Sequence, residues 1–275
     1  MPTEKRMFNL RKDVFDERDH VVAPAAIPSP NSCSLEPNLG PVTDQGRMGS
    51  CTGQAGGGWM AWLYRSFEQY FHTKVSGPVQ FSALFLYAME RQLGGTFPHD
   101  SGSDSRTLMK VLNQIGICLE ADNPYNQHAT AAKPTDAMIA AAGKYRIGAY
   151  HRVPFDEGMA TAKSVLISGY CRVIGIPVFK AFESDEVAET GMVPVPGPRE
   201  TPIGGHEMMS FGFDDRVRIG SSIGAEMVRN SWSEQWGIRG NLFIPYDYYS
   251  AVGGDETCDS WVGHLGRPWK PSKIA

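Results

Sequence analysis

Residues 44–51 read Asp-Gln-Gly-Arg-Met-Gly-Ser-Cys and lead directly into an apolar stretch. The two glycines predict a turn, and the apolar residues that follow at helical spacing predict a helix over residues 51–72. Cys51 then stands in the first turn of that helix. The unpaired N–H groups and partial positive charge of a helix N-terminus stabilise a thiolate, so Cys51 is a candidate nucleophile.

The other cysteines lack such a setting and are expected to be structural. The chain has five cysteines, an odd number, so they cannot all pair in disulfides within one chain. The four in question lie in a proline-rich segment, an apolar run, an expected strand and a polar loop: Cys33, Cys118, Cys171 and Cys258.

Composition excludes several classes of protein. The chain has 275 residues with 41% hydrophobic and 20% charged residues, which is typical of a globular protein with a substantial core. Its net charge of −4 argues against a nucleic-acid partner or a polybasic membrane contact. The charged N-terminus does not resemble a secretory signal peptide, and no apolar stretch is long enough to cross a bilayer. We therefore expect either a cytoplasmic location or export by a signal-independent route.

The pattern changes twice along the chain. Residues 1–40, called the leader below, are charged and then proline-rich, and we expect them to be extended, irregular and outside the core. Residues 41–130 form an expected helical lobe that carries Cys51, and residues 131–275 form an expected β-rich lobe. The fold class is therefore α+β, with a cleft between two lobes.

Individual elements follow from periodicity and from turn residues. Besides the helix that starts at residue 51, helices are expected at residues 80–92, 104–115 and 156–168. Ser103 or Asp104 opens the helix at 104–115, and Gly116 closes it. Strands are expected in the second half, separated by Gly and Pro, at residues 170–179, 207–213, 225–230 and 240–245.

Two polar residues could assist a cysteine nucleophile. His206 stands in Gly-Gly-His-Glu, within an expected strand, and Asn230 opens Asn-Ser-Trp-Ser-Glu-Gln-Trp-Gly. The remaining histidines have no comparable setting. With these two residues as partners, Cys51 becomes a stronger candidate nucleophile than a lone cysteine.

These three blocks together resemble the papain-like cysteine peptidases. The matching residues are Gln-Gly-x-x-Gly-Ser-Cys, then Gly-His, then Asn-Ser-Trp-x-x-x-Trp-Gly, over roughly residues 41–250. His206 and Asn230 lie further downstream than the ~130–150 residues usual for the family, which a longer loop at 191–205 explains. The leader, with Asp-Glu-Arg-Asp at 16–19, is similar to the short N-terminal segments of xylellain-like bacterial members.

The resemblance implies a role for each matching residue. Cys51 would be the nucleophile, and His206 would pair with its thiolate and then protonate the leaving amine. Asn230 would orient the imidazole ring. Gln45 would donate to the oxyanion beside the Cys51 backbone N–H. Trp232 would cover the His–Asn pair, although it could also be a plain core residue.

Some positions depart from the family pattern. Thr52 replaces the usual aromatic residue after the nucleophile, and Met48 replaces a cysteine, so the disulfide usual at that place cannot form. The Gly-Cys-x-Gly-Gly block is missing. Gly94, Gly95 and Gly102 are its candidate remnants. Of these, Gly94 and Gly95 are candidate substrate contacts, as is Trp232.

Glu207, directly after His206, is a further candidate contact with substrate. In the family this position lines the pocket for the side chain second from the scissile bond, so a carboxylate there would favour a basic side chain. The alternative is that Glu207 points to solvent or pairs with an arginine.

The leader has two possible roles. It could lie over the cleft and restrain activity, as in a zymogen, or it could be a strap packed on the second lobe. A peptide or protein substrate is implied, and no metal or organic cofactor.

Motifs of other enzyme classes match the sequence only in part. Gly-Ser-Cys-Thr-Gly matches a nucleophile elbow, but no buried strand precedes it. His206-Glu207 begins a zinc-peptidase-like motif whose fifth position is Ser210, not histidine. A papain-fold binding protein without turnover, or an acyltransferase that uses the same residues, remains an alternative.

Overall fold

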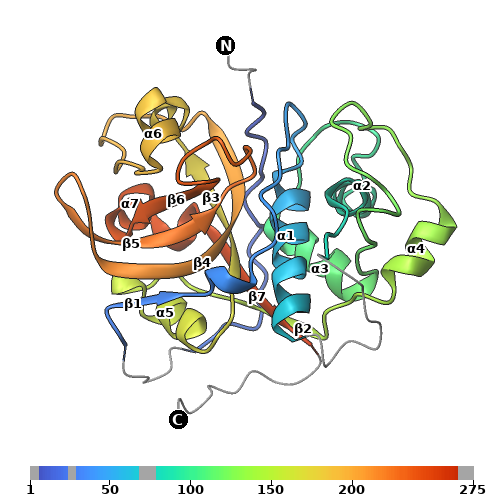
Figure 1. Cartoon of the computed structure of the whole chain (residues 1–275), viewed down its shortest axis with the longest axis horizontal. Helices are drawn as coiled ribbons and strands as arrows, with labels where there is room; N and C mark the ends of the chain where they lie inside the picture. The colour runs from blue at the N-terminus through green and yellow to red at the C-terminus, as the bar shows by residue number, and fades with distance from the viewer. Residues whose placement is uncertain (1–5, 24–28, 68–78, 266–275) are drawn as a thin grey trace.

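The computed structural model describes residues 6–23, 29–67 and 79–265. The early helices of the chain gather on one side of the molecule, and an antiparallel sheet with the later helices lies on the other (Figure 1). Helix α1 (Cys51–Ser66) lies between the two sides. This confirms the α+β, two-lobed arrangement expected from the sequence. Among the described residues, no helix has the length and apolar character needed to cross a bilayer.

The helical side is built around α1. Thirteen of its 16 residues are buried, so α1 is a central helix and not an amphipathic surface helix. Helices α2 (Ala83–Leu93) and α3 (Ser105–Gln114) pack beside it, and the short α4 (Asp136–Ala142) lies further out. Asp104 caps α3 by accepting the Thr107 N–H at 2.8 Å, as the sequence predicted.

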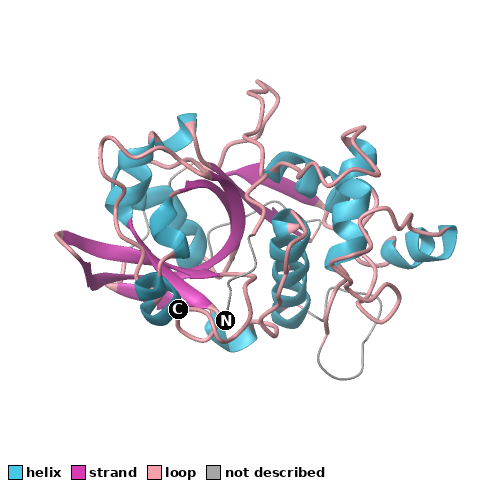
Figure 2. Ribbon diagram, turned by 90° about the horizontal axis from the view of Figure 1, so that it is seen from above, coloured by secondary structure: helices cyan, strands magenta, loops and turns pink. Residues whose placement is uncertain are grey.

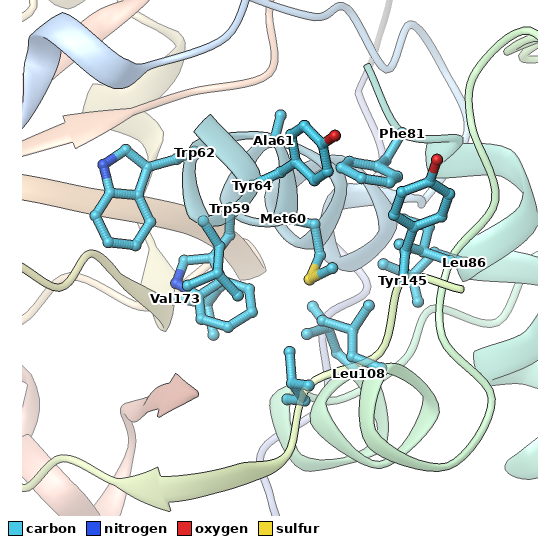
Figure 3. Packing of buried hydrophobic residues seen from close by; sticks show 14 of the residues in the cluster. Trp59, Met60, Ala61, Trp62, Tyr64, Phe81, Leu86, Leu108, Tyr145 and Val173 are labelled. Atoms are coloured by element: carbon cyan, nitrogen blue, oxygen red, sulfur yellow. The ribbon is translucent and has the colours of Figure 1, made fainter. Parts of the chain in front are cut away.

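One hydrophobic core joins α1 to both sides of the molecule. Figure 3 shows Trp59, Met60 and Leu108 packed together, with Val173 of the sheet close to Trp59. The Trp59 indole N–H donates to the Cys171 carbonyl at 2.9 Å, so this buried polar group is satisfied across the lobe boundary.

The sheet has the order β2-β7-β3-β4-β5-β6, with β1 paired to β4 off this path, and all of these pairings are antiparallel. It curls round a helix in the manner of a barrel (Figure 2). The strands are β1 (Ser32–Ser34), β2 (Ala149–Arg152), β3 (Arg172–Val178), β4 (Gly204–Ile219), β5 (Ser222–Arg229), β6 (Asn241–Pro245) and β7 (Asp259–His264).

Alternation along β4 separates two neighbouring residues of the site. Met208 packs into a second core, formed by the sheet with α5 (Ala160–Ile167), α6 (Asp185–Thr190) and α7 (Tyr246–Val252), whereas Met209 packs into the core around α1. Because successive strand residues point to opposite faces, His206 and Glu207 also point to opposite sides of the sheet.

The sequence located most of these elements but not all. The expected helix at 156–168 is helical as α5 only from Ala160, because Gly158 and Met159 adopt left-handed φ angles of 64° and 59°. Strand β4 is longer than expected, since it runs on to the hairpin turn at Gly220. The sequence reading assigned no element to α4, α6, α7, β1, β2 or β7. Residues 68–72 of the expected first helix lie outside the described residues.

The leader is more integrated than the sequence predicted. Its β1 adds a strand to β4, and Val22 is buried in the second core. The Val22 N–H donates to the Arg152 carbonyl at 2.8 Å. The expectation that residues 1–40 lie outside the core is therefore wrong for this part. The helical core also extends past residue 130, since Tyr145 and Ile147 belong to it.

Gly53 and Gly58 of α1 provide a matched test of helix packing. A Cβ at Gly53 would lie 2.4 Å from the Ala83 carbonyl oxygen, whereas a Cβ at Gly58 would meet nothing within 4 Å. We expect Gly53→Ala to lower the free energy of unfolding by about 1–3 kcal/mol through overpacking. Gly58→Ala should raise it by about 0.5–1 kcal/mol through helix propensity. Urea unfolding of both variants measures this, and a stability unchanged in Gly53→Ala would contradict the tight contact between α1 and α2.

Candidate active site

Cys51 begins α1, at the junction of the two lobes. Its sulfur lies close to the backbone N–H groups of Thr52, in its own helix, and Glu207, in β4. Since Glu207 directly follows His206, the nucleophile candidate and the histidine candidate are brought together from opposite lobes. The structure thus places two sequence-predicted residues, far apart in the chain, at one point.

His206 is fixed by Asn230. The His206 Nε2 lies 2.8 Å from Asn230 Oδ1, and the same oxygen accepts the Ser231 N–H at 2.8 Å. Because that oxygen can only accept, Nε2 carries the proton and Nδ1 keeps its lone pair. Among the described residues, His206 Nδ1 has no hydrogen-bond partner. The ring therefore presents an unprotonated nitrogen.

Trp232 covers the histidine. Its ring stacks on that of His206 with a centroid distance of 4.9 Å, and Trp236 packs against it edge-on at 4.8 Å. Trp232 and His206 are both essentially inaccessible to solvent. The tryptophan is thus both a core residue and a cover for the His206–Asn230 hydrogen bond.

Gln45 is held from both lobes. Its Oε1 accepts from the Ser231 hydroxyl at 2.7 Å and its Nε2 donates to the Met48 carbonyl at 3.1 Å. The Tyr125 hydroxyl donates to the Gln45 carbonyl at 2.8 Å. These bonds fix the amide plane and leave the second Nε2 hydrogen available to a ligand beside Cys51.

The leader crosses this site. The Gly205 N–H donates to the Phe8 carbonyl at 3.1 Å, and the Leu10 N–H donates to the Gly205 carbonyl at 3.2 Å. On the other side, the Arg11 N–H donates to the Ser103 carbonyl at 2.8 Å. The chain here runs between α1 and the sheet (Figure 1). Residues 6–12, called the cleft segment below, therefore bridge both lobes.

Side chains of the cleft segment lie directly on the site. The Phe8 ring meets His206 and Trp232 edge-on, with centroid distances of 6.1 and 5.8 Å. Asn9 fills the space beside the cysteine loop, since a Cβ at Gly49 would lie 2.2 Å from the Asn9 side chain. The leader therefore contributes to the burial of Cys51 and His206.

Comparison with known proteins identifies the family. No family model matches the sequence. A peptidase C1-like protein of Acanthamoeba polyphaga mimivirus is 32% identical over 257 residues, which cover 90% of this chain and 73% of that protein. The chain belongs to the papain-like (C1) family of cysteine peptidases.

Solved structures agree with this assignment. Xylellain, a cysteine protease of Xylella fastidiosa, has a TM-score of 0.83 and 27% identity, and the match covers 97% of this chain and 99% of xylellain. The bromelain protease of Ananas comosus, with 17% identity and a TM-score of 0.59 over 86% of this chain and 99% of its own, shows the same fold. The chain is thus a papain-like hydrolase, as the sequence motifs predicted.

The electrostatics of the covered site oppose an ion pair. Burial raises the pKa of the Cys51 thiol to about 12 and lowers the pKa of His206 to about 4. The sequence predicted a helix N-terminus that stabilises the Cys51 thiolate. With the leader in place, desolvation outweighs that effect, so the peptidase holds a neutral thiol beside a neutral imidazole.

Glu207 lies inside the molecule, on the side of the sheet that faces α3. It is fully buried, its Oε2 accepts from the Ser105 hydroxyl at 2.6 Å, and burial raises its pKa well above the usual range. It is not exposed to solvent and has no arginine partner among the described residues, so the alternative of a solvent-facing or arginine-paired Glu207 is wrong. The expected contact with substrate stays a prediction. Its Oε1 has no hydrogen-bond partner among the described residues.

The glycines differ in their distance from the cleft. Gly102 lies against the leader, since a Cβ there would lie 1.9 Å from the Asn9 carbonyl oxygen. Gly94 lies near the Arg11 guanidinium, and Gly95 has nothing within 4 Å of its Cβ position. The cleft wall is therefore formed at Gly102, which the sequence named only as a third remnant.

Glu90 is a residue near the site that the sequence reading missed. It is a fully buried member of α2, and its Oε2 accepts from the hydroxyl of Thr52, the residue after the nucleophile. Burial raises the pKa of Glu90 to about 8. The only signal in the sequence was a carboxylate on an otherwise apolar helix face.

Glu90 should make stability depend on pH. Its folded pKa of about 8 exceeds the unfolded value of 4.5, so its favourable contribution is complete below pH 4.5 and is lost as pH rises to 8. Glu90→Gln keeps an acceptor for Thr52 and removes the titration. We expect its stability relative to the unmodified chain to increase from pH 5 to pH 8, measured by urea unfolding. Glu189→Gln, on exposed α6, serves as the control, and an equal response in both variants would contradict the assignment.

Proposed function

We propose that this peptidase cleaves peptide bonds through Cys51, His206, Asn230 and Gln45. The observation that supports the proposal most directly is the state of His206. Its Nε2–H is held by Asn230, its Nδ1 has no hydrogen-bond partner among the described residues, and the backbone N–H of the residue that follows it lies close to the Cys51 sulfur. This is the arrangement that activation of a thiol by an adjacent base requires.

The chemistry follows from those positions. His206 Nδ1 takes the Cys51 proton, and the thiolate attacks the substrate carbonyl carbon to form a C–S bond. The negative charge on the carbonyl oxygen is met by Gln45 Nε2–H and the Cys51 N–H. The imidazolium then protonates the leaving amine as the C–N bond breaks. Water, deprotonated by His206, attacks the thioester and releases the acid and the thiol.

We further propose that the leader restrains this reaction. Support comes from the cleft segment, whose backbone bonds to Gly205 and Ser103 occupy both walls beside His206. Phe8 lies over His206, and burial is the main cause of the neutral thiol and imidazole. When the segment leaves, water enters, and the ion pair becomes accessible. The strap role is compatible with this, because β1 and Val22 hold the later part of the leader.

Removal of Gln45 should affect turnover. Gln45→Ala deletes an oxyanion donor, so we expect kcat for a peptide substrate to fall about 10²–10³-fold. Cys51→Ala should reduce hydrolysis to background. Gln114→Ala, at the exposed end of α3, is the matched control and should leave kcat unchanged. If Gln45→Ala retained full kcat, the oxyanion role would be excluded while the nucleophile could still stand.

Removal of the Phe8 ring should open the site. Phe8→Ala deletes the cover on His206 and Trp232 in the full chain. We expect iodoacetamide to alkylate Cys51 about tenfold faster, with a parallel rise in peptidase activity. A tenfold change corresponds to a loss of about 1.4 kcal/mol in the free energy that holds the cleft segment on the site. Phe15→Ala, in the same leader at 78% exposure, is the control. Equal alkylation rates for both variants would contradict the proposal that the leader restrains activity, and would leave the peptidase assignment unchanged.

A further inference from the structure

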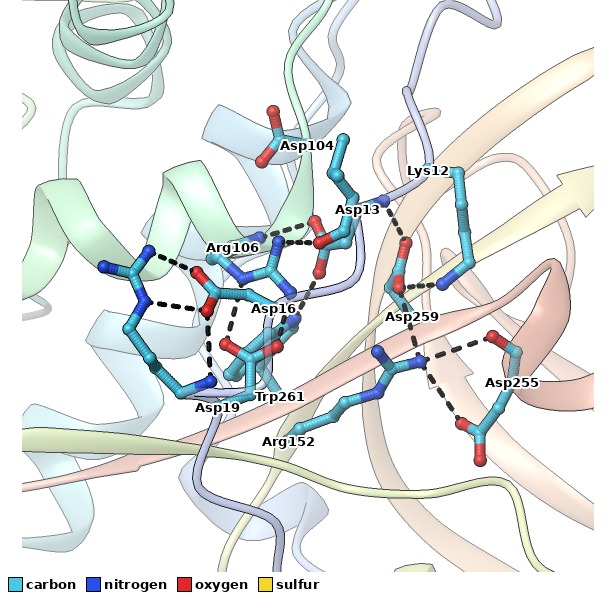
Figure 4. Close-up of polar contacts among 12 residues, drawn as sticks. Lys12, Asp13, Asp16, Asp19, Asp104, Arg106, Arg152, Asp255, Asp259 and Trp261 are labelled. Carbon is cyan, nitrogen blue, oxygen red and sulfur yellow. Dashed lines mark hydrogen bonds and ion pairs between the residues drawn. The ribbon is translucent and has the colours of Figure 1, made fainter.

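The cleft segment is strongly basic, and its cations meet carboxylates of the peptidase body. Residues 6–12 read Arg-Met-Phe-Asn-Leu-Arg-Lys, with three positive charges and no negative charge. The Arg11 guanidinium lies 3.4 Å from Asp104, and Lys12 forms an ion pair with Asp259. Figure 4 shows Lys12 extended alongside Asp259. The space that the cleft segment occupies is called the channel below. The inference rests on the proposed function, because it concerns which peptides the channel binds.

The third cation sits at the other end of the segment. Arg6 lies over the Trp232 ring, 4.6 Å from its centroid. Its pKa is lowered by burial, and Asp44 and Glu183 act in the opposite direction as the nearest negative charges. Cations therefore lie on both sides of the catalytic residues, and each faces a different part of the body.

The charges of Asp104 and Asp259 are only partly neutralised by cations outside the cleft segment. Asp104 uses Oδ1 to cap α3, and its Oδ2 has Arg11 as its ion-pair partner among the described residues. Asp259 is 3.8 Å from Arg152, which also contacts Asp255 (Figure 4). If the cleft segment leaves, Asp104 loses its cation and Asp259 keeps a distant one. The emptied channel is thus negative at both sites.

Leu10, which stands between the cations of the cleft segment, occupies a recess beside Gly175. A Cβ at Gly175 would lie 2.8 Å from both a Leu10 methyl group and the Glu207 carboxyl, so Leu10 occupies a recess formed by the missing side chain of Gly175. Burial raises the pKa of Glu207 well above its usual range, because the recess is shielded from water. The contact with the Leu10 methyl group shows that the recess suits an aliphatic side chain.

We propose that the channel selects cationic peptides, in which an aliphatic residue for the recess at Gly175 is flanked by lysine or arginine residues that reach Asp104 and Asp259. The leader occupies the channel because it is a member of this class. A charged hydrogen bond to a partly buried carboxylate is stronger than a neutral one, so replacement of the cations should weaken binding. These ion pairs assign the preference for basic side chains to Asp104 and Asp259 instead of Glu207.

The test uses the full chain with three substitutions that weaken the cleft segment: Phe8→Ala, Arg11→Gln and Lys12→Gln. For the binding measurements, Cys51→Ala is added so that the peptides are not cleaved. The probes are two fluorescent peptides, Arg-Met-Phe-Asn-Leu-Arg-Lys and the same peptide with Gln at each basic position. We expect the basic peptide to bind at least about tenfold more tightly, a preference that Asp104→Asn reduces severalfold. Asn retains the helix cap, so the fold should not suffer. Asp136→Asn, at the start of α4, is the control.

Two outcomes would overturn the proposal. Equal affinity for both peptides, or binding of neither, excludes charge selection. A preference that persists unchanged in both Asp104→Asn and Asp259→Asn would reflect only the net charge of the chain. Hydrolysis is scored separately in the chain that keeps Cys51. Selective binding without turnover would refute the proposed function and not the selectivity, whereas turnover without selectivity would do the reverse.

Discussion

Burial of α1 between the helices and the sheet is the constraint on which the site depends. Gly53 lets this helix approach the Ala83 carbonyl, and Trp59 bonds across to Cys171. A helix enclosed in this way can present reactive groups only at its ends. Its N-terminus meets the start of β4, and that meeting point joins Cys51 to His206. Packing of apolar residues remote from this point thus sets the relative position of the two proposed catalytic residues.

Much of this could be predicted from the sequence, because the reacting groups stand in short motifs with a fixed order. Cys51, His206 and Asn230 were identified by neighbouring glycines and tryptophans, and the structure brings them together. The state of Glu207 could not be predicted in this way. Strand alternation indicates that it opposes His206, but its raised pKa results from burial by other segments, and its hydrogen bond to Ser105 joins residues far apart in the chain. Short elements such as β2 and β7 carry too few residues for a clear period.

The path of the leader was the other feature beyond the sequence. Its proline-rich composition indicated irregular structure, yet irregular backbone can be ordered when it borrows hydrogen bonds from a sheet and a loop, as it does at Gly205 and Ser103. These contacts join residues separated by more than 90 positions. No local pattern encodes such a pairing. The charges on Arg11 and Lys12 were visible, but their partners were not.

The leader is fastened in two places of different character. Asp13 accepts the Arg106 N–H at 3.0 Å and the Trp261 indole N–H at 2.7 Å, and Val22 and β1 bind to the sheet further along (Figure 4). The cleft segment lies wholly before this anchor. The proposed release of the cleft segment would therefore leave the rest of the leader in place to stabilise the fold. Deletion of the entire leader would remove both parts together, so the proposed restraint and the structural role are separable only by substitutions before Asp13.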